Sequence, residues 1–151
     1  THQLAYNSGL QTRYADNPVW LSEGLAIYFE TPDLRNSRGW RNIGKVHRGR
    51  LETLQRGLEK RSSDALVRML TDDAWLRDPE TATAAYAEAG GWCFCLSKRY
   101  SEEFSAYLSE LSTLEPLTTT TSAERLATFR KHFGNLPELD EQFVRYIRAI
   151  R

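Results

Sequence analysis

A glutamate inside an apolar helix is the first residue of this sequence that suggests chemistry. Residues 17–32 read NPVWLSEGLAIYFETP, a pattern that predicts a helix with apolar side chains on nearly every face and Glu23 among them. A carboxylate that enters an apolar interior without a partner costs several kcal/mol or takes up a proton. Glu23 must therefore face solvent, pair with a basic side chain or bind a metal ion, since a divalent cation is a strong compensating charge.

His2 is a second residue that could bind a metal ion together with Glu23. Twenty residues separate the two, which leaves room for a helix, a loop and a second helix packed against the first. A zinc site needs three or four ligands, and neither His47 nor His132 has a geometric reason to be the third. From residue types and spacing alone, the ion pair, the exposed position and the metal site all stay open for Glu23.

The residues around Glu23 resemble the third-ligand segment of the gluzincin metallopeptidases. WLSEGLA at residues 20–26 is similar to the W-L-x-E-G-x-A pattern of the thermolysin and aminopeptidase N group. Thr1-His2 is similar to the last two positions of the H-E-x-x-H motif that carries the first two zinc ligands of that group, and Asn7 also fits the aminopeptidase-like pattern. The similarity is greatest to an uncharacterised bacterial family of peptidase-MA-like gluzincins.

This resemblance implies a zinc-dependent peptidase. His2 would be the second zinc ligand and Glu23 the third, while Gly24 would let another backbone approach the ligand helix. The first histidine and the general-base glutamate of the motif would lie before Thr1. We therefore expect the chain to be the C-terminal portion of a catalytic domain that hydrolyses a peptide or protein substrate with Zn²⁺ in the parent protein. By itself the chain is expected to be inactive. An exported bacterial protein is a further implication of the resemblance.

The resemblance also implies a role for a tyrosine. In aminopeptidase-like gluzincins, a tyrosine on a helix well after the third ligand donates a hydrogen bond to the oxyanion of the tetrahedral intermediate, and Tyr86 is placed to do the same. A phenol suits this role because it donates a hydrogen bond without adding a charge. The apolar stripe that contains Tyr86 equally predicts a core tyrosine. Glu30, on nearly the same helix face as Glu23, is expected to be solvated or to cap the helix end.

The elements that must position these residues are helical almost throughout. The clearest helix is expected over residues 79–100, where apolar side chains recur at intervals of three and four. Gly90 and Gly91 each cost this helix about 1 kcal/mol relative to alanine, which indicates that another element approaches closely there. Further helices are expected at residues 1–10, from Pro18 to Pro32, 51–61, 64–70, 102–111, 122–133 and 139–150.

No segment shows the alternation of a strand. The expected fold class is therefore all-α, one helical domain over residues 1–151. The resemblance makes this domain the multi-helix C-terminal part of a zincin-like catalytic domain. Ser63 is expected to cap the helix after it, and Thr121 with Glu124 forms the pattern of a capping box.

The composition describes an ordinary globular protein. Twenty basic and twenty acidic residues balance, which weighs against binding to nucleic acids or membranes that is driven by net charge. No apolar run approaches the length needed to cross a membrane. Cys93 and Cys95 would point to different sides of one helix, so we expect two buried free thiols. The pattern points to no particular oligomeric state.

A basic stripe between residues 35 and 50 supports a second class of function, the binding of a nucleic acid or another polyanion. No acidic residue lies between Asp33 and Glu52. Gly39 and Gly44 weaken a helix here, and we favour a solvated basic face, so no nucleic-acid partner is expected. A third hypothesis is a degenerate gluzincin whose fold serves as an interaction or scaffold module. The residues of the stripe are Arg35, Arg38, Arg41, Lys45, Arg48 and Arg50.

Overall fold

The regular structure in the described part of the chain is entirely α-helical. The computed structural model describes residues 2–7, 9–30 and 44–151, with the backbone alone for residues 2–4, and no strand occurs among them. This confirms the predicted all-α fold. No helix in this part of the chain combines the length and the apolar character needed to cross a lipid bilayer. The helices are α1 His2–Asn7, α2 Val19–Phe29, α3 Arg48–Gly57, α4 Ala65–Thr71, α5 Ala74–Arg77, α6 Ala82–Arg99, α7 Ser101–Leu111, α8 Ser122–Phe133 and α9 Leu136–Ala149.

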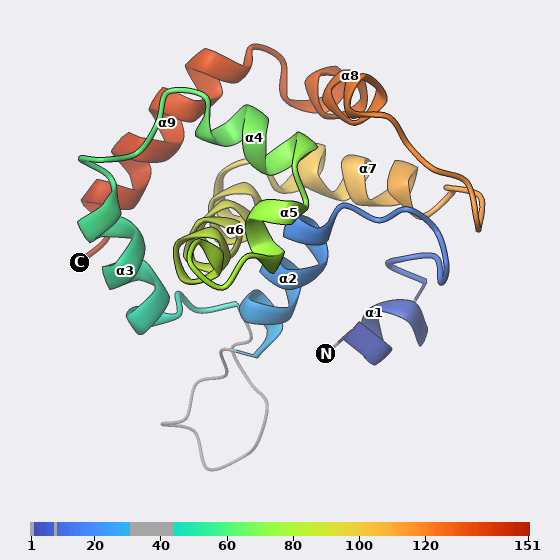
Figure 1. The fold of residues 1–151 in the computed structure, drawn as a ribbon, viewed down its shortest axis with the longest axis horizontal. Helices are drawn as coiled ribbons and strands as arrows, with labels where there is room; N and C mark the ends of the chain where they lie inside the picture. The colour runs from blue at the N-terminus through green and yellow to red at the C-terminus, as the bar shows by residue number, and fades with distance from the viewer. Residues whose placement is uncertain (1, 8, 31–43) are drawn as a thin grey trace.

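Helix α6 lies in the middle of the fold, with α2 and α3 on opposite sides of it in Figure 1. Helices α5, α7 and α9 also contact α6. Its side chains are buried in several directions, which explains why small and apolar residues dominate it. The buried residues of α6 are Ala85, Ala87, Glu88, Ala89, Gly90, Trp92, Cys93, Cys95 and Leu96.

Gly24 allows α2 to approach α6 to backbone contact. A Cβ atom at this position would lie 2.5 Å from the carbonyl oxygen of Ala89 and 2.5 Å from the sulfur of Cys93. No side chain fits there without moving α6. The expectation that Gly24 lets another backbone come close is confirmed, and the backbone is that of α6.

The paired glycines of α6 serve two different neighbours. A Cβ atom at Gly90 would lie 2.9 Å from Cγ2 of Ile27 on α2, and one at Gly91 would lie 2.5 Å from Cδ2 of Leu54 on α3. The prediction of a close approach at this point is confirmed. Consecutive helical residues point about 100° apart, so each glycine accommodates a different helix.

Helices α8 and α9 complete the core with aromatic side chains that pack on α6 and α7. The ring of Phe143 stacks on Trp92 with 3.9 Å between centroids, and the ring of Phe129 meets Tyr107 edge-on at 5.4 Å. Phe129 is fully buried and Phe143 nearly so. The aromatic side chains of the last two helices are therefore part of the core built around α6.

Both cysteines are free and buried, as predicted. Burial raises the pKa of the Cys95 thiol to about 12, and it also raises the pKa of Cys93 well above its ordinary value. Both thiols therefore keep their protons at neutral pH. They act as small apolar groups in the contact between α6 and its neighbours.

Candidate functional site

Glu23 and Tyr86 meet where α2 crosses α6. Gly24 lies against Ala89, which is one helical turn beyond Tyr86, so the crossing places residue 23 next to residue 86. Both side chains are partly buried. Burial raises the pKa of the Tyr86 phenol, and the negative charge of Glu23 raises it further. A phenol with the ordinary pKa of 10.0 is already protonated at neutral pH, and a hydrogen bond with Glu23 adds to the rise.

Arg50 brings a positive charge from a third helix to the same place. Its guanidinium carbon lies 5.5 Å from the centroid of the Tyr86 ring. The positive charge of Arg50 partly offsets the rise in the pKa of Tyr86. Burial has the larger effect, so the pKa remains above its ordinary value. Helix α3 begins just before Arg50 because Nδ1 of His47 accepts a hydrogen bond from the Arg50 backbone N–H at 3.3 Å.

Sequence reasoning missed the place of Arg50 in this group. It assigned Arg50 to a solvated basic stripe, whereas the side chain is partly buried over Tyr86. Arg50 and Tyr86 are 36 residues apart, and only the packing of α3 on α6 brings them together. No local pattern carries that information.

The rest of the basic stripe has little helical structure in the described part of the chain. Residues 44–47 are not helical, so Lys45 and Arg48 do not share a continuous helix. Both side chains are exposed. The first three arginines of the stripe lie outside the described residues, namely Arg35, Arg38 and Arg41.

His2 begins helix α1, and its side chain lies outside the described part of the structure. The turn after α1 is held by the Ala5 carbonyl, which accepts from the backbone N–H groups of Leu10 at 3.0 Å and Gln11 at 3.2 Å. The side-chain amide of Gln11 donates to Ser22 Oγ at 2.8 Å. The segment after α1 is thereby attached to α2 at the residue next to Glu23.

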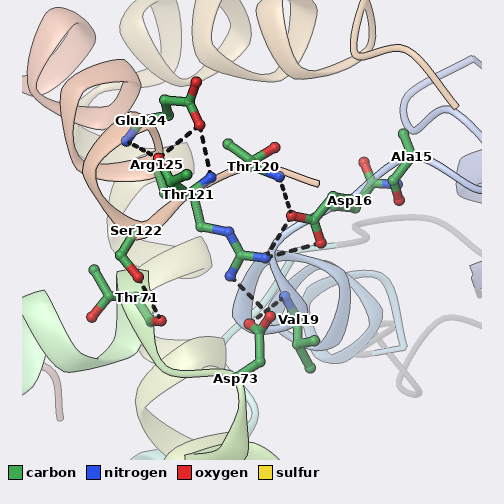
Figure 2. A network of polar contacts seen from close by, with 11 residues as sticks. Ala15, Asp16, Val19, Thr71, Asp73, Thr120, Thr121, Ser122, Glu124 and Arg125 are labelled. Atoms are coloured by element: carbon green, nitrogen blue, oxygen red, sulfur yellow. Dashed lines mark hydrogen bonds and ion pairs between the residues drawn. The ribbon is translucent and has the colours of Figure 1, made fainter. Parts of the chain in front are cut away.

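A buried arginine holds the start of the Glu23 helix (Figure 2). Arg125 of α8 binds Asp16 at 3.0 Å and Asp73 at 2.8 Å. Asp73 also accepts a hydrogen bond from the backbone N–H of Val19, the first residue of α2, at 3.2 Å. The network joins the N-terminus of α2 to α5 and α8. It thereby helps to fix the position of the helix that carries Glu23.

Glu30, His132 and His47 make contacts at helix ends. Glu30 is exposed and is the C-cap of α2, with its N–H bonded to the Ala26 carbonyl. His132 lies in the last turn of α8, and its Nε2 is 2.7 Å from a carboxylate oxygen of Glu110. His47 caps α3 as described above.

Among the described side chains, one could serve as a zinc ligand in the expected site. No group of three or more His, Cys, Asp or Glu side chains among them is arranged to hold a metal ion. Of the two expected ligands, only Glu23 has a described side chain. A carboxylate is a normal zinc donor, and this one is partly buried beside a neutral phenol. Its chemistry and surroundings are compatible with a ligand, and the other ligands would come from outside the described side chains.

A comparison with known proteins gives the family. The family described as "Protein of unknown function (DUF1570)" matches residues 1–118. The chain belongs to the DUF1570 family. The match to DUF1570 includes Glu23, Arg50 and Tyr86, and it ends before α8 and α9. No curated protein and no solved structure matches the chain.

Proposed function

We propose that this chain is part of a zinc-dependent peptidase. Glu23 and His2 would hold the metal ion, and Tyr86 would bind the carbonyl oxygen of the scissile peptide bond. The observation that supports this best is the meeting of Glu23 with Tyr86 at the α2–α6 crossing, from positions 63 residues apart. Neither the apolar pattern of α2 nor that of α6 requires these two polar side chains to face each other.

Each residue has a defined task in this proposal. A bound zinc ion would supply Lewis acidity toward water and toward the scissile carbonyl. The Tyr86 phenol is protonated at neutral pH, as an ordinary tyrosine is, and burial and Glu23 raise its pKa further. It can therefore donate a hydrogen bond to the carbonyl oxygen as negative charge develops there. The further zinc ligand and the general base would come from outside the described side chains.

The zinc content of the full-length gene product that contains this chain tests the proposal. We expect about one zinc ion per molecule in the wild-type protein, because a catalytic site of this class binds a single ion. Glu23→Gln should lose most of the zinc, since an amide is a much weaker ligand than a carboxylate. Glu30→Gln is the matched control: it changes the exposed C-cap of the same helix and should leave the zinc content unchanged.

Two outcomes would contradict the proposal. If Glu23→Gln keeps its zinc while its circular dichroism matches the wild type, Glu23 is not a ligand. If the wild-type protein holds no zinc and cleaves no peptide from a quenched-fluorescence library, the fold is better explained as an interaction or scaffold module.

A further inference from the structure

Arg50 differs from the other partly buried arginines. Among the described residues, three arginines are partly buried rather than exposed: Arg50, Arg61 and Arg125. Arg61 and Arg125 each bind two carboxylates, at distances between 2.6 and 3.0 Å. Arg50 forms no ion pair with a described carboxylate, and its guanidinium contacts the ring of Tyr86. Among the described residues, the two arginines of the core are therefore paired with carboxylates, whereas Arg50 lies against the ring of Tyr86 instead.

A guanidinium that has no ion pair with a described carboxylate is suited to a carboxylate ligand. It carries five N–H donors in a planar fork that matches the two oxygens of a carboxylate. A carboxylate that completes these donors forms charge-assisted hydrogen bonds, which are stronger than those between neutral groups. The guanidinium carbon lies 5.5 Å from the centroid of the Tyr86 ring, so Arg50 belongs to the same place as the proposed donor.

The surroundings of Arg50 carry the same sign of charge. Arg50 lines a small pocket of about 20 Å³ between α2, α3 and α6 together with Lys45 and His47. No acidic side chain lines this pocket, and neither Glu23 nor Tyr86 is among its lining residues. Phe94 and Tyr28 form part of its apolar wall. An anionic group beside Arg50 therefore meets no competing carboxylate from the residues that line this pocket.

We propose that Arg50 binds a carboxylate of the substrate, so that the site selects peptides with a negative charge near the bond held at Tyr86. This inference rests on the proposed peptidase function. The carboxylate is either the free C-terminus of the peptide or an Asp or Glu side chain. The first source would make the enzyme cleave near C-termini, and the second would give it a preference for acidic sequences.

Peptide binding to the full-length protein tests this inference. The probes are four dansylated alanine pentapeptides: the free acid, its C-terminal amide, and two amides that carry a central Glu or a central Gln. The protein is first freed of metal by dialysis against a chelator, so that the measurement does not depend on zinc. Fluorescence anisotropy gives the Kd of each probe for the wild type, Arg50→Gln, Arg50→Lys and the exposed control Arg48→Gln.

We expect the wild type to bind one carboxylate-bearing probe about 10- to 100-fold more tightly than its matched neutral probe, as for one charge-assisted hydrogen-bonded pair. Arg50→Gln should remove this preference, Arg50→Lys should retain part of it, and Arg48→Gln should leave it intact. The free acid or the glutamate probe identifies the source of the carboxylate.

An equal preference in the wild type and a folded Arg50→Gln variant would overturn the inference, as would the absence of any preference in the wild type. The preference can exist without zinc or peptide cleavage, in which case only the peptidase proposal fails. Cleavage of neutral and acidic peptides at equal rates would leave the peptidase proposal standing and refute the role of Arg50.

Discussion

At the scale of single residues, the hydroxyl of Tyr86 is the group whose removal separates catalysis from packing. Tyr86→Phe keeps the ring that lies under Arg50 and deletes only the proposed donor. On the proposed peptidase function, we expect kcat to fall by about 10- to 1000-fold with little change in KM, the usual cost of one oxyanion donor. Tyr146→Phe is the control, because Tyr146 is a partly buried ring on α9 that stacks on Phe94. Turnover that survives Tyr86→Phe unchanged would remove Tyr86 from the mechanism.

The glycine beside Glu23 offers a stability test at the same scale. Gly24→Ala would place a Cβ atom 2.5 Å from the Ala89 carbonyl oxygen, and overpacking of this kind typically costs about 1–3 kcal/mol. Gly57→Ala is the matched control, since a Cβ atom there has no neighbour within 4 Å. It should be neutral or stabilising by up to about 1 kcal/mol. Urea unfolding followed by circular dichroism measures both, and a Gly24→Ala variant as stable as the wild type would refute the close approach.

The sequence predicted part of the candidate site because part of its signal is local. Glu23 is conspicuous as a charge in an apolar helix, whereas the role of Gly24 was implied by the resemblance. The pairing of Glu23 with Tyr86 required a resemblance to other proteins, since nothing local links the two positions. The place of Arg50 was missed because it depends on which face of α3 packs on α6. The same reason explains why the buried partners of Arg125 were not foreseen.

At the scale of helices, the Arg125 network ties three elements together and gives stability a dependence on pH. Burial tends to raise the pKa of Asp16, but the hydrogen bonds from the Thr120 N–H and from Arg125, together with the Arg125 charge, lower it below the ordinary value of 3.8. The folded state therefore holds the charged carboxylate more strongly than the unfolded chain does. This stabilisation is present above pH 3.8 and is lost as the pH falls through the lower pKa of the folded state.

We expect the free energy of unfolding to decrease when the pH falls below about 4. Asp16→Asn should cost about 1–3 kcal/mol at pH 7, because Arg125 loses a charged partner, and its stability should depend less steeply on pH in the acid range. Urea unfolding between pH 7 and pH 2.5 measures the free energy of unfolding of the wild type and of Asp16→Asn. Glu141→Gln, on the exposed face of α9, should follow the wild-type curve. Parallel curves for the wild type and Asp16→Asn would show that Asp16 contributes nothing to the pH dependence.

Helix boundaries were predictable where a side chain caps the backbone. The capping box of Thr121 and Glu124 is present, and α8 begins at the next residue after Thr121. Helix α9 starts at Leu136 instead of residue 139, because the Asn135 side chain accepts the Glu138 N–H and a proline follows at the start of the helix. The prediction of Ser63 as a cap is wrong.

The N-cap of α4 is Asp64, without a side-chain cap bond. The short α5 was not foreseen at all. Its four residues are too few to show a helical period, and Trp75 and Leu76 are buried by tertiary packing.

At the scale of the whole molecule, the folded core extends beyond the residues that the family match covers. The DUF1570 match ends at residue 118, yet α8 and α9 insert Phe129, Phe143 and Ile147 into the core, each no more than 1% exposed. Removing one buried phenylalanine side chain typically costs about 3–5 kcal/mol. A domain of this size has about 5–15 kcal/mol in total. The core around α6 therefore cannot be completed by the matched residues alone.

Truncation after residue 118 should consequently abolish cooperative folding. Without α9 the indole of Trp92 loses the stacked ring of Phe143, and without α8 Tyr107 loses Phe129. We expect residues 1–118 to lack a sigmoidal urea transition and to lose the near-ultraviolet circular dichroism of the buried aromatic side chains. A chain that lacks only Arg151, which is exposed, should unfold like the full chain. A cooperative transition in residues 1–118 would mean that α2, α3 and α6 form a core of their own. The candidate site would then not require α8 and α9.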